Sequence, residues 1–206
     1  MKLTQRSIVD LLAAFRSSDP TQGGGSASAL AGAVGASLLA MVAGLPKPRA
    51  ASEEDQGRLR AAGARCSALA ERLTELIDRD SAAYDLVVAA YRRPKGTDEE
   101  KASRSTSIQE ALRAATDTPL DVMRAAHAAL EQSVVVAEFG NRNASSDVQV
   151  GIELLTAALR GARLNVETNL GSVKDEGYAR SVRSEIAELV AAADRESAAA
   201  RAQLTA

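Results

Sequence analysis

The amino-acid sequence predicts an all-α protein, a multihelical bundle of long and short helices in a single domain. Its 206 residues are 46% hydrophobic, which is enough material for one core. Alanine occupies 43 positions, whereas aromatic residues make up 2% of the chain and tryptophan is absent. The β-branched and aromatic side chains that strands favour are therefore in short supply. We expect one helical domain that covers residues 1–206.

Helix caps and helix breakers divide the chain into successive helices. Ser26 follows three glycines and is placed to cap a helix that Pro46 ends. Ser52 and Asp55 form a capping-box pattern before a helix with no breaker for about forty residues. The pair Thr118-Pro119 is typical of a new helix start. The expected helices run over about 4–16, 26–45 and 53–92, from 97, from 118 to 140, from the loop 141–146 to 170, and from 175 onward.

Charge and rare residues exclude several kinds of protein. The 25 basic and 27 acidic residues give a net charge of −2, so no strongly basic face for nucleic acid is expected. A single cysteine, Cys66, and a single histidine, His127, argue against an internal disulfide or a Cys/His metal site. The uncharged stretch 26–45 has the length of a membrane span, but small residues dominate it, so we expect a buried helix in a cytoplasmic protein with no membrane partner. His127 is expected to face the core or an interface.

Asp80 interrupts the apolar face of the expected helix 53–92. Apolar residues recur there at alternating steps of three and four, which is the spacing of antiparallel helix packing. A carboxyl among apolar groups has its charged form desolvated, so its pKa rises and it can serve as a general acid or base near neutral pH. The alternatives are pairing with a buried arginine or a wide, wet part of the helix interface. Asp78, off this face, is interpreted as a solvated surface charge.

Glycines and asparagines supply further candidates. Gly23, Gly24, Gly25 and Ser26 at a helix start could offer backbone N–H groups to an anion, although we favour a tight turn that needs positive φ angles. Asn165 and Asn169, one turn apart and poor in helix propensity, predict hydrogen bonds to a ligand or to a neighbouring backbone.

Two polar loops complete the set of candidates. The loop with Asn141, Ser146 and Asp147 lies between two apolar helices. Lys47 and Arg49, next to prolines, could meet a carboxylate substrate or remain simply solvated.

Four blocks of sequence match one protein family in the same order, and four ordered matches identify a family much more specifically than any single one. They cover residues 20–26, 77–84, 94–101 and 140–147, and Asn165 and Asn169 follow. Together they resemble the cyclodeaminase/cyclohydrolase family of tetrahydrofolate enzymes, over roughly the whole chain. Two departures are Gln22, where the family usually has proline, and the stretch 45–49, where close relatives have glycine followed by consecutive basic residues.

The resemblance implies a catalytic role for Asp80, a folate as the small-molecule partner, no cofactor beyond the tetrahydrofolate substrate, no metal and a homodimer. The glycine–serine turn and the asparagines would hold the pterin and carboxylate ends, and Lys47 or Arg49 the glutamate tail. The substrate-binding candidates are Gly23, Gly24, Gly25, Ser26, Lys47, Tyr84, Asn141, Ser146, Asp147, Asn165 and Asn169.

Two folate reactions fit one acid/base group. One is hydrolysis of 5,10-methenyltetrahydrofolate to 10-formyltetrahydrofolate, and the other is release of ammonia from formiminotetrahydrofolate. Hydrolysis is slightly favoured, because 206 residues leave no room for a formiminotransferase domain. A non-catalytic helical interaction protein, or a relative that acts on another heterocycle, stays open. The small-residue helix 26–45 favours a dimer, unless it is the central helix of a monomer.

Overall fold

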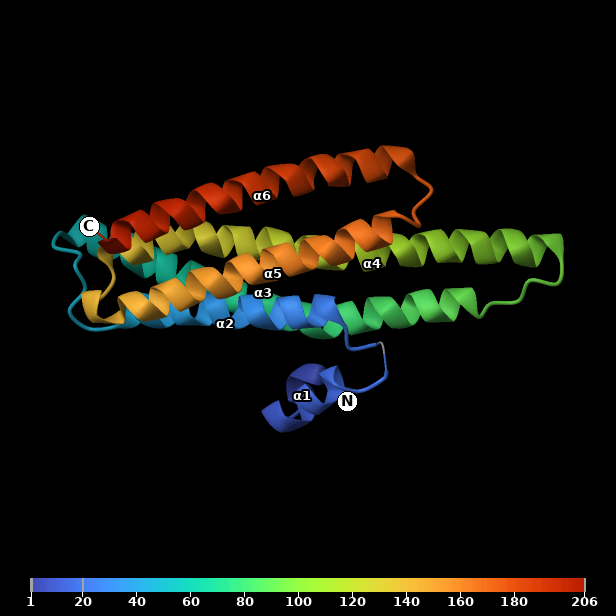
Figure 1. The fold of residues 1–206 in the computed structure, drawn as a ribbon, viewed down its shortest axis with the longest axis horizontal. Coiled ribbons are helices and arrows are strands. Elements are labelled where there is room, and N and C mark those ends of the chain that lie inside the picture. Colours follow the sequence, from blue (N-terminus) through green and yellow to red (C-terminus); the bar gives the residue numbers. More distant parts are fainter. Residues whose placement is uncertain (1, 20, 206) are drawn as a thin grey trace.

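A computed structural model describes residues 2–19 and 21–205, and the predicted all-α bundle is confirmed over these residues, which form no strand. Figure 1 shows the long helices side by side in an elongated bundle, with α1 off one side. In chain order the elements are the 3₁₀ helix η1 (Leu3–Gln5), α1 (Ile8–Phe15), α2 (Gly24–Gly44), α3 (Glu53–Tyr91), α4 (Asp98–Phe139), the 3₁₀ helix η2 (Arg142–Ala144), α5 (Ser145–Leu170) and α6 (Glu176–Thr205).

Local capping signals place most helix starts as predicted. Ser52 accepts a hydrogen bond from the backbone N–H of Asp55 at 3.0 Å, at the start of α3. Thr97 and Glu100 form a complete capping box at the start of α4. The expected helix 4–16 is instead split, because Ser7 accepts from the N–H of Asp10 and begins α1.

Pro119 lies inside α4, so the predicted new helix at residue 118 is wrong. Proline has no N–H to donate, which leaves the carbonyl of Ala115 without its usual partner one turn earlier. Asn169 of α5 donates its side-chain amide to that carbonyl at 2.7 Å. The lost helical bond is thus replaced from a neighbouring helix, and α4 continues as one helix of 42 residues.

Small residues bring α2 and α5 close together. A Cβ added to Gly35 would lie 2.8 Å from the backbone oxygen of Gly151, and one on Gly32 would lie 3.2 Å from the Cβ of Ala158. The backbone that packs on the small-residue helix is therefore α5 of the same chain, as expected for a central helix. By length and composition α2 could cross a membrane, but it buries one face against α3 and α5.

The buried apolar face of α3 ends near Asp80. The spacing of three and four predicts a face from Leu59 through Leu76 to Tyr84 and Tyr91. The part from Leu59 to Leu76 is buried, whereas Tyr84 and Tyr91 are 37% and 49% exposed. Figure 1 gives the reason: the α3–α4 hairpin extends past the ends of α2 and α5. A separate small apolar cluster joins this hairpin to the connection between α5 and α6, namely Ala90, Ile108, Ala111, Leu112 and Val173.

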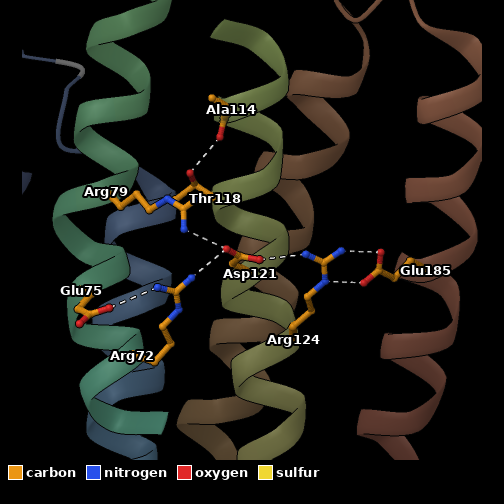
Figure 2. Close-up of polar contacts among 8 residues, drawn as sticks. All are labelled: Arg72, Glu75, Arg79, Ala114, Thr118, Asp121, Arg124 and Glu185. Carbon is orange, nitrogen blue, oxygen red and sulfur yellow. Dashed lines mark hydrogen bonds and ion pairs between the residues drawn. The ribbon is translucent and has the colours of Figure 1, made fainter. Parts of the chain in front are cut away.

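Ion pairs connect α3, α4 and α6 on one surface (Figure 2). Asp121 accepts from Arg72 at 3.1 Å, from Arg79 at 3.2 Å and from Arg124 at 2.9 Å, and Arg124 also binds Glu185 of α6. Since these groups are partly exposed, each pair contributes less than about 1 kcal/mol.

Candidate active site

The carboxyl of Asp80 lies against the first turn of α2. It is half-buried, and its Oδ2 accepts a hydrogen bond from Ser26 Oγ at 2.9 Å. A Cβ on Gly25 would lie 2.7 Å from Oδ2 and closer still to Oδ1, so only glycine leaves room for the carboxyl. A Cβ on Gly24 would lie 3.2 Å from Nδ2 of Asn165. The glycines make space for two polar side chains from α3 and α5.

This steric role replaces the expected turn. No described glycine has a positive φ angle, so the interpretation of the glycines as a tight turn is wrong. The helix begins at Gly24 with Gly23 as its N-cap, so Ser26 lies inside the first turn and does not cap it. Its side chain faces α3 instead, because Asp80 and the carbonyl of Ile77 accept hydrogen bonds there.

Burial raises the pKa of Asp80 above its usual range, because the charged carboxylate loses water. The hydroxyl of Ser26, and then its backbone N–H, act in the opposite direction by stabilising the charged form. The direction agrees with the one expected from the apolar face of α3. A half-buried carboxyl of raised proton affinity is suited to accept and return a proton.

Asp78 has a different role from the one expected. It accepts from the backbone N–H of Leu3 at 2.6 Å and from Oγ1 of Thr4 at 2.6 Å. The interpretation as a solvated surface charge is therefore wrong, because an amino-terminal segment remote in sequence covers it. The sequence contains no local signal for this contact, since its partners are about 75 positions away.

Asn165, Asn169 and Tyr84 belong to the same end of the bundle as Asp80. The amide of Asn165 donates to the carbonyl of Gly161 at 3.0 Å, and that of Asn169 to Ala115. Both asparagines are half-buried and bind backbone, one of the two partners that were expected. Tyr84, one turn after Asp80, leaves part of its ring exposed.

A second group of candidates lies at the opposite end of α2. Lys47 follows that helix, and Asn141 donates to the carbonyl of Pro46 at 2.7 Å. Ser146 and Asp147 begin α5 at this same end. The 21 residues of α2 separate the two groups by about 30 Å, at 1.5 Å per residue. Within one chain, the structure does not bring this group to Asp80.

The remaining single residues are in helix interfaces. The guanidinium of Arg49 donates to the carbonyl of Ala137, where it supports the end of α4. His127 is half-buried beside the core of α4, and Cys66 is a buried free thiol whose pKa burial raises to about 12. Over residues 2–19 and 21–205, no three His, Cys, Asp or Glu side chains gather as a metal site.

Comparison with known proteins identifies the fold and the family. A family model described as formiminotransferase-cyclodeaminase matches residues 7–188. The chain belongs to this family. The resemblance carried by the four sequence blocks is thereby confirmed.

The names of similar proteins are of two kinds, cyclohydrolase and cyclodeaminase. Methenyltetrahydrofolate cyclohydrolase from Methylorubrum extorquens is 40% identical over 91% of this chain and 90% of its own length. Formimidoyltransferase-cyclodeaminase from Sus scrofa is 32% identical over 85% of this chain, which spans about a third (32%) of that protein. Formiminotetrahydrofolate cyclodeaminase from Thermotoga maritima has the same fold, with a TM-score of 0.87 and 24% identity over 99% of this chain and 98% of its own.

Proposed function

We propose that this protein is an enzyme of one-carbon tetrahydrofolate metabolism that hydrolyses 5,10-methenyltetrahydrofolate to 10-formyltetrahydrofolate. The observation that carries the proposal is the half-buried carboxyl of Asp80, held over Gly25 with a raised pKa. The relative named methenyltetrahydrofolate cyclohydrolase supports the hydrolytic direction, because it matches this chain along nearly its whole length.

In this reaction Asp80 moves one proton. Water adds to the carbon that bridges N5 and N10, and Asp80 takes the proton that the water loses. The carbon–N5 bond then breaks, Asp80 gives its proton to N5, and the hydroxyl proton leaves to solvent as the formyl group on N10 forms. A carboxyl placed in this way typically accelerates such steps about 10²–10⁴-fold. The bridge is already cationic, so the proposal includes no metal and no further cofactor.

A second candidate is formiminotetrahydrofolate cyclodeaminase activity. The family model and the 30–32% identity to formimidoyltransferase-cyclodeaminases from four vertebrates favour it. N10 would attack the carbon of the protonated formimino group and lose its proton to Asp80, and Asp80 would then give this proton to the nitrogen that leaves as ammonia. The same carboxyl serves both reactions, so the choice depends on which folate the surrounding side chains accept.

The substrate contacts belong to the proposal. Gly24, Asn165, Asn169 and Tyr84 lie at the end of the bundle where Asp80 is, and they are the candidates for holding the pterin. The other candidates lie about 30 Å from Asp80, at the opposite end of α2: Lys47, Asn141, Ser146 and Asp147. In a single chain they could contact only a part of the substrate that is far from the reacting carbon. We place the protein in the cytoplasm, with no membrane or nucleic-acid partner.

We also propose a homodimer, on a new physical ground. Ile8 and Val9 of α1 are 77% and 72% exposed, and Leu12, Val34 and Met41 are exposed as well. A groove of about 580 Å³ with apolar lining lies between this segment and α2. Exposed apolar surface of this kind is typical of protein interfaces, and a two-fold pair would cover both copies at once.

Two assays on the purified chain test the function. Loss of methenyltetrahydrofolate absorbance measures hydrolysis, and ammonia release from formiminotetrahydrofolate measures deamination. We expect the first to be the faster, and Asp80→Asn to abolish it while folate binding remains. Faster ammonia release would favour the second candidate. Turnover of neither folate by a folded protein would favour a non-catalytic role or another heterocycle.

A further inference from the structure

Ser26 occupies a position where its single hydroxyl proton has more than one acceptor. The residue is fully buried, with 0% exposure. Its Oγ lies 2.9 Å from Oδ2 of Asp80, 3.0 Å from the carbonyl oxygen of Ile77 and 3.2 Å from Oγ of Ser81. Either hydroxyl of the two serines can be the donor, but Ser26 has one hydrogen and can give it to only one partner at a time.

We propose that Ser26 is a positioning residue whose hydroxyl holds Oδ2 of ionised Asp80 and turns to the carbonyl of Ile77 when Asp80 takes up a proton. This inference rests on the proposed function only in making Asp80 the group that exchanges protons. A hydrogen bond to a charged carboxylate is stronger than one to a neutral oxygen, so the ionised acid takes the hydroxyl proton. Once Asp80 is neutral, the backbone carbonyl becomes the better acceptor.

The rotation needs no heavy atom to move. Only the hydrogen on Oγ turns about the Cβ–Oγ bond, and the buried hydroxyl keeps a partner in both states. A buried donor without a partner is unfavourable, so the second acceptor keeps the hydroxyl bonded when Asp80 is neutral, whereas an apolar residue here would withdraw a donor from the ionised acid. Gly25 adds the second constraint, because it lets the carboxyl lie close enough to α2 for this contact.

Charged groups around Asp80 have partners of their own. On α3, Asp78 is bonded to Leu3 and Thr4, and Arg79 pairs with Asp121 of α4. Helix α2 has no charged residue along Gly24–Gly44, and α5 places the uncharged amide of Asn165 over Gly24. Burial and Ser26 are the causes that shift the pKa of Asp80. Ser26 is therefore the residue whose removal should change the proton affinity of this acid.

The test is a carbon-13 NMR titration of the Asp80 carboxyl, assigned with Asp80→Asn, in the wild type and in Ser26→Ala. Without the hydroxyl the charged form loses a donor, so we expect the proton affinity of Asp80 to rise about tenfold. Ser28→Ala is the matched control, because Ser28 is buried in the same helix but donates to Gly24. Ser26→Cys, which keeps the shape with a weak donor, should give a smaller rise and serves if Ser26→Ala does not fold.

An unchanged titration in Ser26→Ala, or in Ser26→Cys if that variant has to be used, would overturn the inference, as would an equal change in Ser28→Ala. The titration needs no substrate, so it tests the role of Ser26 independently of the proposed function. The proposed function fails by a different result, namely that neither folate turns over. If the enzyme is active, kcat/KM falls at low pH because Asp80 must be ionised to act as the base. In Ser26→Ala this fall should occur about one pH unit higher, which matches a tenfold rise in proton affinity.

Discussion

Gly25 and Asp80 are in direct contact, and the carboxyl of the acid occupies the space that any side chain at position 25 would need. We expect Gly25→Ala to displace the carboxyl and lower turnover by about 100-fold, since a 1 Å error at a reacting group costs that much. Initial rates with methenyltetrahydrofolate measure the loss. Gly57→Ala on α3 is the control, because the nearest atom to its Cβ is 4.0 Å away. That variant should keep its activity and gain about 0.5–1 kcal/mol of stability.

Asp80→Asn should be inactive and yet at least as stable as the wild type at pH 7. The folded protein binds the Asp80 proton more tightly than the unfolded chain, because burial raises this pKa. Asp80 therefore contributes its full share to the free energy of unfolding at pH values below the pKa of an unfolded aspartate. This contribution is lost as the pH rises through the raised pKa of the folded state. Asparagine removes that dependence while still accepting from Ser26. Thermal unfolding at several pH values measures it, and a lower midpoint for the variant at every pH would contradict the assignment.

Asn169 and Pro119 should be energetically coupled. Asn169→Ala leaves the carbonyl of Ala115 without its donor, which should cost about 1–3 kcal/mol. Pro119→Ala restores an N–H that can bond the same carbonyl, so the double variant should lose less than the sum of the single variants. Urea unfolding of all four proteins closes the cycle. Strict additivity would show that the two residues act independently.

Leu12→Glu should convert the proposed homodimer to a monomer. Leu12 belongs to the exposed apolar face of α1, and a buried charge at an interface would be strongly unfavourable. Sedimentation at micromolar concentration should give about half the wild-type mass. Leu86→Glu is the matched control, since Leu86 is an exposed leucine of the α3–α4 hairpin and lies outside that face. A monomeric wild type would reject the dimer.

The helices that could be predicted are those whose ends are encoded within a few residues. Ser52 and Thr97 cap their helices with partners three positions away, and the sequence is sufficient there. Pro119 was misinterpreted because the donor that compensates for it, Asn169, is 50 positions further along the chain. The contacts of Asp78 could not be predicted for the same reason, since the segment that binds it folds back from the start of the chain.

In the candidate site, too, local features could be predicted and contacts between distant segments could not. Periodicity indicated Asp80, because a break in an apolar repeat is a local feature, and the family resemblance selected the same residue. The steric role of Gly25 needed the position of α3 against α2, which no pattern within one helix contains. The distance of Lys47 from the glycine–serine turn was in principle available, since the expected helix 26–45 already separates the two.

The α3–α4 hairpin that projects past α2 and α5 gives the molecule one stiff end and one compliant end. The cluster that packs against it has five buried residues, far fewer than the core of the bundle, so the hairpin's amides should exchange with solvent sooner than those of the bundle. Asp80 lies at the border, bonded to Ser26 of α2 on one side and followed by the projecting end of α3 on the other. Local opening of the outer stretch should therefore leave the acid in place, because Ser26 of α2 holds Asp80 from the side of the bundle.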